Sequence, residues 1–409
     1  MVTGEHSIAS LEESTDMTRR YYGIMGIRRG LVHFLIGKSS SAVLGFTAAV
    51  LLVRVMSIRE YATYAALLGL QMVIIVMASL GFDRFVTRYL PEMRQQCSEG
   101  ELKAYVFCLM GIRGVALLVV AALVLVYQEL LFSLFDFGSD REALIAAVAY
   151  MVVLGISQLA LRSQQALMLQ RAAKWAQIAE AALRLLAVVV VAYLLNELVS
   201  AAVAIWINLA AILASLTISL CNLYFRLPPA QVDGDSNPEP SDMMRFGMQN
   251  YVQSVLLLPM DPPSLRLLAA AVLAPSAIAA YGFFQTITGV FRRYLPVQLL
   301  LDLTEPVLFA RYSESKDFKA LNFSTNLLLK INLALILPVA GWIFICGATI
   351  VPVITNGKYG EFAWLLGILI VGLVYESHWI VLRTVINADR QSGLLVSGAA
   401  ESCLLFAIL

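Results

Sequence analysis

Long runs of apolar residues, separated by short polar segments, constrain the fold of this 409-residue chain more than any other feature. Each run is long enough to cross the hydrocarbon core of a bilayer, about 30 Å thick, as an α-helix. The chain is 60% hydrophobic and 14% charged, whereas soluble domains average about 45–50% and about 25%. Helices satisfy their own backbone hydrogen bonds in lipid. The sequence therefore predicts an all-α, polytopic membrane helical bundle.

We expect about eleven membrane spans from the apolar runs. Their predicted residues are 31–56, 62–80, 104–127, 142–161, 176–195, 200–222, 247–273, 277–305, 324–350, 362–385 and 394–409. Pro259, Asp261, Pro262 and Pro263 interrupt the seventh run. Because proline removes a backbone donor and breaks a helix, this span is predicted to be broken or re-entrant.

The polar residues 1–30 precede the first span, and no apolar stretch typical of a cleavable signal lies within them. Most Lys and Arg residues of the loops lie on the same side of the membrane as this N-terminal segment. The opposite side carries five, which are Arg54, Arg59, Arg141, Arg266 and Lys358. Because positive loops stay inside, we expect a multi-pass protein of the cytoplasmic (inner) membrane with a cytoplasmic N-terminus.

The segment at residues 223–245 divides the chain into two predicted lobes. Its Pro, Gly and acidic residues favour a solvated connector. Short matches between the halves, such as Arg88-Tyr89 with Arg311-Tyr312, recur at offsets of 217 to 223 residues. The predicted organisation is an N-terminal cytoplasmic segment at 1–30, a first six-helix lobe at 31–222, the linker at 223–245, and a second lobe at 246–409.

The two lobes would be parallel repeats, an arrangement typical of transporters, with the substrate site between them. The repeat implies that the second lobe should extend beyond Leu409. We therefore expect the second lobe to be truncated, with its sixth span and part of its fifth absent. The alternative is a naturally shorter protein with a degenerate last helix.

A motif pattern near the N-terminus resembles a known family. It comprises Arg54-Val-Met-Ser-Ile-Arg-Glu-Tyr61 and Leu80-Gly-Phe-Asp-Arg-Phe-Val-Thr-Arg-Tyr-Leu-Pro-Glu92, with echoes at Ala280-Tyr-Gly-Phe-Phe284 and Asn356-Gly-Lys-Tyr-Gly360. These stretches are similar to polysaccharide transporters, the flippases for O-antigen and capsule repeat units. That family belongs to the multidrug/oligosaccharidyl-lipid/polysaccharide exporter superfamily. Its members usually have 12 to 14 spans and an uninterrupted seventh helix, so this chain departs from the pattern in its second lobe.

The resemblance implies a flippase that moves a lipid-linked oligosaccharide of the undecaprenyl-pyrophosphate type to the outer leaflet by alternating access. The implied partners are that substrate, membrane lipids, and the glycosyltransferases and polymerase of the same pathway. A multidrug or cation exporter of the same superfamily is the alternative, and a membrane enzyme such as a polysaccharide polymerase is a further one. Such an enzyme needs a sizeable outer loop or clustered catalytic residues. The predicted outer loops are short and the three histidines are dispersed, which disfavours the enzyme.

Ionisable residues within spans are costly and are therefore candidates for function. We hypothesise that four cations line a cavity between the lobes and bind the pyrophosphate: Lys38, Arg113, Arg184 and Arg292. Arginine suits this role because its planar fork matches phosphate. Lys38 and Arg293 could instead extend to headgroups, and Arg113 could pair with an acid on a neighbouring helix. The acids expected to face these cations are Asp302, Glu305 and Glu376.

Other classes of function find little support in the sequence. The net charge of +1 gives no basic field for nucleic acid. The five cysteines are scattered without a CxxC pair and without clustered histidines. We therefore predict no disulfide framework, no metal site, no cofactor and no nucleic-acid partner.

Overall fold

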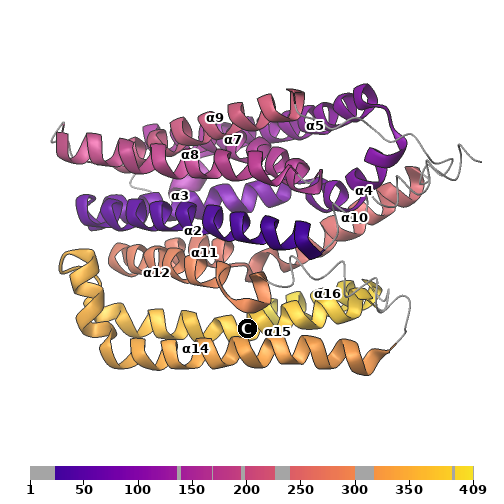
Figure 1. The fold of residues 1–409 in the computed structure, drawn as a ribbon. Coiled ribbons are helices and arrows are strands. Elements are labelled where there is room, and N and C mark those ends of the chain that lie inside the picture. The colour runs from indigo at the N-terminus through magenta and orange to yellow at the C-terminus, as the bar shows by residue number, and fades with distance from the viewer. Residues whose placement is uncertain are drawn as a thin grey trace, which may run out of the picture.

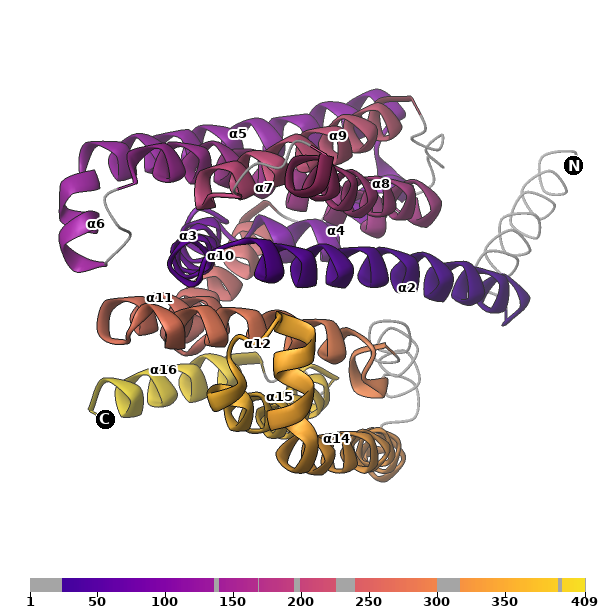
Figure 2. The same ribbon diagram turned by 90° about the vertical axis from the view of Figure 1, so that its left-hand side faces the viewer.

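The computed structural model describes residues 24–135, 140–167, 169–194, 199–225, 240–299, 317–388 and 392–408. Every regular element within these ranges is a helix. The helices lie roughly side by side in two groups, one above the other in Figure 1, and the turned view in Figure 2 shows the same division. The predicted all-α bundle is thereby confirmed.

The first group, called lobe one here, holds eight α-helices in the described part of the chain. They are α2 (Ile24–Val55), α3 (Ile58–Met77), α4 (Phe82–Gln96), α5 (Glu99–Val126), α6 (Gln128–Leu134), α7 (Arg141–Ala166), α8 (Gln170–Val189) and α9 (Ala201–Phe225), with a π-helical turn at Val190–Leu194 after α8.

The second group is called lobe two. It comprises α10 (Pro240–Leu257), a 3₁₀ turn (Leu258–Met260), α11 (Pro262–Val272), α12 (Pro275–Arg293), α14 (Phe318–Thr355), a 3₁₀ turn (Gly360–Phe362), α15 (Ala363–Ala388) and α16 (Ser392–Ile408). The described ends of α9 and α10 reach into the predicted 223–245 linker from both sides.

Polar residues at the helix starts explain several boundaries. Ser98 caps α5 and forms a reciprocal capping box with Glu101, which satisfies donors that the first turn leaves without partners. Ser57 caps α3 by accepting from the Glu60 amide at 3.2 Å. Asp140 caps α7 in the same way.

Eight helices of the described residues are long and apolar enough to cross a membrane. Many large apolar side chains on them are exposed, including Val119 on α5, Trp342 on α14 and Trp364 on α15. A soluble protein rarely leaves so much apolar surface in contact with water. The chain is a multi-pass membrane protein.

Several predicted boundaries differ from the observed ones. The helix α2 begins at Ile24, seven residues before the predicted first span and inside the predicted 1–30 segment. The predicted eighth span ends at 305, but α12 ends at Arg293, because the turn at Tyr294 is followed by Pro296, which supplies no backbone donor. The interruption predicted in the seventh span is present, since the 3₁₀ turn at Leu258–Met260 separates α10 from α11.

Helix pairing follows the same order in the two lobes. In lobe one, α2 packs on α8, α3 on α7, and α5 on α7. In lobe two, α10 packs on α16, α12 on α15, and α14 on α15. This correspondence is what the predicted parallel repeat requires.

Candidate functional site

The two lobes meet along α3, which packs against α11 and α12. The contact is close because small residues line it. A Cβ added at Gly69 would lie 2.9 Å from the carbonyl oxygen of Pro263, and one at Gly282 would lie 2.5 Å from the Cβ of Ala65. Tyr61 of α3 packs edge-on against Phe283 of α12, with ring centroids 6.5 Å apart. We call this contact the seam.

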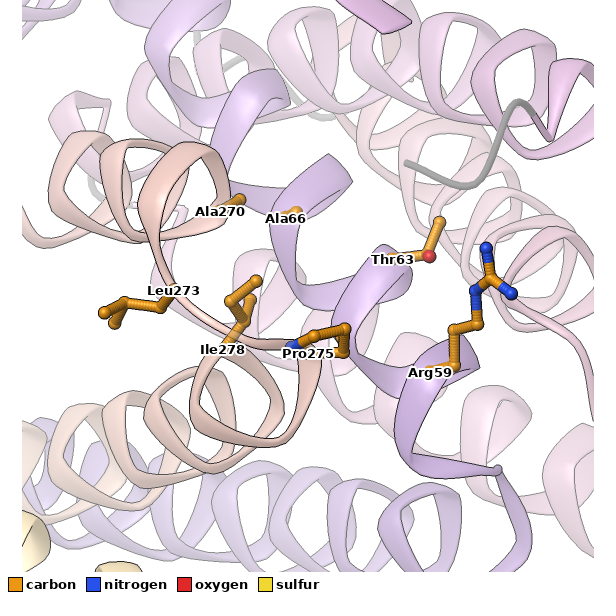
Figure 3. Close-up of a pocket in the computed structure, with 8 residues that line it drawn as sticks. Arg59, Thr63, Ala66, Ala270, Leu273, Pro275 and Ile278 are labelled. Atoms are coloured by element: carbon orange, nitrogen blue, oxygen red, sulfur yellow. The ribbon is translucent and has the colours of Figure 1, made fainter. Parts of the chain in front are cut away.

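A small pocket opens along the seam (Figure 3). Arg59, Thr63 and Ala66 of α3 form one wall, and Ala270, Leu273, Pro275 and Ile278 of the connected α11 and α12 form the other. Its lining is mostly apolar. It marks the boundary between the lobes rather than a polar binding site.

A second contact joins the lobes at the opposite end of α3. The hydroxyl of Tyr251 on α10 donates to the carbonyl of Met77 at 2.8 Å. Gly81, which has a φ of 76°, lies against the backbone of Gly247. A side chain at Gly81 would strain the backbone and collide with α10.

Arg113, one of the predicted cavity residues, lies inside lobe one. Its side chain is 0% exposed, and its Nη1 donates to Oδ1 of Asp83 on α4 at 2.9 Å. The Nε and Nη2 groups are buried without a partner among the described residues. The described contacts of Arg113 do not reach α8 or α12. The geometry thus matches the alternative given in the sequence analysis, in which Arg113 pairs with an acid on a neighbouring helix.

Arg184 also has a carboxylate partner, one turn away on α8. Its Nη2 donates to Oε1 of Glu180 at 2.7 Å, and the two side chains are 24% and 21% exposed. It interacts electrostatically with Tyr64 of α3 and Tyr150 of α7, so its side chain faces the interior of the bundle.

Arg292 lies at the end of α12 and pairs across lobe two. Its Nη1 donates to Oε1 of Glu376 on α15 at 2.7 Å, with side chains 38% and 33% exposed. Asp261, at the break between α10 and α11, interacts electrostatically with both members of the pair. Glu376 was predicted to face the cations, whereas Asp302 and Glu305 lie outside the described residues.

Arg293 connects the two sets of charges and was not selected from the sequence. Its side chain is exposed, and it interacts electrostatically with Arg292 on its own helix and with Glu180 and Arg184 of the other lobe. Adjacent helical residues point about 100° apart. One of two neighbouring arginines can therefore pair within its lobe while the other faces across the seam.

The fourth predicted residue, Lys38, belongs to α2, but its side chain lies outside the described part of the structure. Arg184 and Arg292 are thus linked only through their electrostatic interactions with Arg293, and the described contacts of Arg113 lie elsewhere. We call Glu180, Arg184, Asp261, Arg292, Arg293 and Glu376 the charged cluster. In the described ranges, no group of His, Cys, Asp and Glu has the geometry to hold a metal ion.

The charged cluster changes the electrostatic expectation from the sequence. Four cations were expected to line a cavity and bind a pyrophosphate, but three of them, Arg113, Arg184 and Arg292, each have a carboxylate partner. Sequence reasoning missed Glu180 and Asp261. A signal for Glu180 was available, because it precedes Arg184 by four residues on one helix.

Comparison with known proteins places these features in a family. A family model described as polysaccharide biosynthesis protein matches residues 27–297. No curated protein matches the chain.

Several solved structures have a similar fold. A multidrug resistance MATE family transporter of the MOP superfamily, in an inward-facing conformation, gives a TM-score of 0.66 at 15% identity, with 89% of this chain and 84% of that chain covered. The lipid II flippase MurJ, in an inward closed conformation, gives a TM-score of 0.62 at 14% identity, with 91% of this chain and 79% of that chain covered. The MATE multidrug transporter DinF-BH gives a TM-score of 0.63 at 12% identity, with 92% of this chain and 86% of that chain covered.

These likenesses show the fold, and the family model covers more than half of the chain. The resemblance carried by the motifs at residues 54–61 and 80–92 is thereby confirmed. The protein belongs to the polysaccharide biosynthesis protein family, and it has the fold of the MOP superfamily of membrane transporters.

Proposed function

We propose that this protein is a flippase that moves a lipid-linked oligosaccharide of the undecaprenyl-pyrophosphate type from the inner to the outer leaflet, for surface polysaccharide biosynthesis. It would act in the cytoplasmic membrane with its N-terminus in the cytoplasm. The two lobes would rock around the seam and expose the charged cluster alternately to each side. The pathway's glycosyltransferases and polymerase would supply and consume its cargo.

The observation that carries this proposal is the electrostatic interaction of Arg293, at the end of α12 in lobe two, with Arg184 and Glu180 of lobe one. A pyrophosphate between the lobes would meet arginines from both of them. Arginine binds phosphate through two parallel hydrogen bonds, which are about twice as strong as neutral ones. The family match and the structural likeness to a lipid II flippase point to the same class of cargo.

The carboxylates of the charged cluster have a defined role in this mechanism. Glu180 and Glu376 hold Arg184 and Arg292 in place when no cargo is bound. In both arginines the Nε group is buried and has no partner in the described structure. An unpaired buried donor is costly, so a phosphate oxygen that reaches it gains affinity.

The alternative is a multidrug or cation exporter. The three acids of the charged cluster, Glu180, Asp261 and Glu376, favour it, because a cationic cargo needs acidic groups within the membrane. Two of the similar solved structures are described as multidrug transporters. The flippase predicts that substitution of Arg293 reduces the amount of surface polymer. The exporter predicts that the polymer is unchanged.

The test uses a strain that lacks this gene, complemented with single variants. We expect Arg293→Gln and Arg292→Gln to reduce surface polymer about tenfold or more. Each variant loses charge-assisted hydrogen bonds to the cargo that contribute more than about 1.4 kcal/mol, and that free energy corresponds to a factor of ten. The lipid-linked repeat unit should accumulate. Arg162→Gln on α7 is the matched control, because Arg162 is exposed and forms no ion pair in the described structure. Unchanged polymer, with altered resistance to cationic toxins, would favour the exporter.

A further inference from the structure

The end of α2 and the end of α14 are joined by a pair of reciprocal contacts. Arg54, in the last turn of α2, donates from Nε to the carbonyl of Ile354 and from Nη2 to that of Val353, both at 2.7 Å. These carbonyls belong to the last turn of α14. The partners are 300 and 299 residues apart in sequence.

Lys358 makes the contact in the opposite direction. Its Nζ donates to the carbonyls of Val53 at 2.8 Å, Arg54 at 3.1 Å and Met56 at 2.7 Å. These groups lie at the C-terminus of α2. Burial among them lowers the pKa of the Lys358 ammonium, which reflects the cost of moving a charge partly out of water.

The turn after α14 aims Lys358 at α2. Asn356 ends the helix with a φ of 57°, and Gly357 follows with a φ of 83°. The amide of Gly357 donates to the carbonyl of Pro352 at 2.8 Å, and the Thr355 hydroxyl donates to the carbonyl of Lys358. Left-handed residues at this position reverse the chain sharply. Lys358 therefore lies on a tight, hydrogen-bonded turn rather than on a long loop.

Each cation compensates the partial negative charge at the C-terminus of the other helix. The last four carbonyls of a helix lack intrahelical partners, and the C-terminus carries a partial negative charge. Arg54 satisfies two carbonyls of α14, and Lys358 satisfies three carbonyls at the end of α2. These five hydrogen bonds have charged donors, so they are stronger than neutral ones.

The contact bridges the two lobes at one end of the bundle. The helix α2 belongs to lobe one, and α14 belongs to lobe two. Figure 1 shows the turn between α14 and α15 at the left of the view, beside the end of α2 and far from the start of α2. By the charge bias of the loops, this end faces the outside of the cell.

We infer that Arg54 and Lys358 form a latch that holds this end of the seam closed and must break each time the lobes open there. The inference rests on the alternating access of the proposed function, because a latch between lobes matters only if the lobes separate. All five hydrogen bonds join the same two helix ends. A small separation therefore breaks them together, and the latch behaves as a two-state device.

The latch is tested by the accessibility of the seam in the purified full-length chain in nanodiscs. The natural cysteines are first replaced by serine: Cys97, Cys108, Cys221, Cys346 and Cys403. Ala270→Cys then places one thiol in the wall of the seam pocket (Figure 3), at a position only 6% exposed. The rate of maleimide labelling reports how often this end opens.

We expect Arg54→Gln with Lys358→Gln to speed labelling about tenfold or more, and each single variant to have a smaller effect. Lys358→Arg keeps a charged donor and should label close to the parent rate. Arg59→Gln is a stringent control, because Arg59 lines the same pocket but makes none of the latch contacts. Its labelling should also match the parent.

Unchanged labelling in the double variant, or equal acceleration by Arg59→Gln, overturns the latch. If the double variant does not elute as a single species, the two single variants are read in the same way. Labelling requires no cargo, so the result is separate from the proposed function. Faster labelling together with failed flipping would overturn the cargo assignment and leave the latch intact.

Discussion

Asp83 compensates the charge of Arg113, which is fully buried within lobe one. Removal of the Asp83 carboxylate tests whether this ion pair stabilises the fold. We predict that Asp83→Asn strongly destabilises the protein, because Arg113 is 0% exposed and Asp83 is its ion-pair partner. Two of the three guanidinium nitrogens of Arg113 already lack a partner among the described residues. Little else is in place to compensate the charge.

The magnitude follows from burial. Breaking a buried pair by removing one partner costs about 3–5 kcal/mol. Asp83 is 34% exposed, so solvent screens part of the interaction, and the lower end of that range, about 3 kcal/mol, applies. At roughly 2 °C for each kcal/mol in a large domain, the melting temperature should fall by about 6 °C.

The assay is thermal unfolding of the purified protein in detergent, with Arg113→Met and the double variant alongside. Arg113→Met leaves the partly exposed carboxylate of Asp83, which water can reach, so we expect a loss of about 1 kcal/mol. The double variant should recover most of the loss in Asp83→Asn and should retain transport. Equal destabilisation by both single variants without recovery would refute the reasoning. A stable double variant that transports nothing would return Arg113 to the cavity.

Two further predictions concern packing within and between the lobes. Gly282→Ala should cost about 1–3 kcal/mol, because the new Cβ would lie 2.5 Å from Ala65; Ala65→Gly in the same chain should restore most of the loss in a melting experiment. Asn332→Leu should cost about 1–3 kcal/mol, since the 0% exposed amide donates to Ser377 at 2.6 Å. Asn326→Leu, at an exposed position of the same helix, is its control, and equal losses in the two would count against the buried hydrogen bond as the cause.

Sequence predicted the features that depend on local pattern. Apolar runs located eight of the eleven predicted spans, because burial in lipid is a property of each segment, and the described parts of the predicted spans 31–56, 277–305 and 394–409 do not meet the same length and hydropathy. Pro259, Pro262 and Pro263 marked the broken helix because proline acts on its own turn. The charge partners were harder to predict. Arg292 and Glu376 are 84 residues apart, and Arg113 and Asp83 are 30 apart, so packing alone brings them together.

The reciprocal latch had no signal in the sequence at all. Its acceptors are backbone carbonyls, such as those of Val53 and Ile354, which every residue possesses. Arg54 and Lys358 were assigned only to the outer loops from charge bias. Their function depends on which helix end lies opposite each of them, and that is a property of the folded bundle.

Movement of a lipid-linked oligosaccharide between leaflets, the function proposed for this protein, is tested most directly in reconstituted vesicles. Purified protein is placed in liposomes that carry a fluorescent undecaprenyl-pyrophosphate-linked sugar, and a membrane-impermeant quencher measures the fraction in the outer leaflet over time. We predict rapid exchange between leaflets with the parent and with Arg162→Gln, and slow exchange with Arg293→Gln. Exchange no faster than in protein-free vesicles, with movement of a cationic dye instead, would contradict the account.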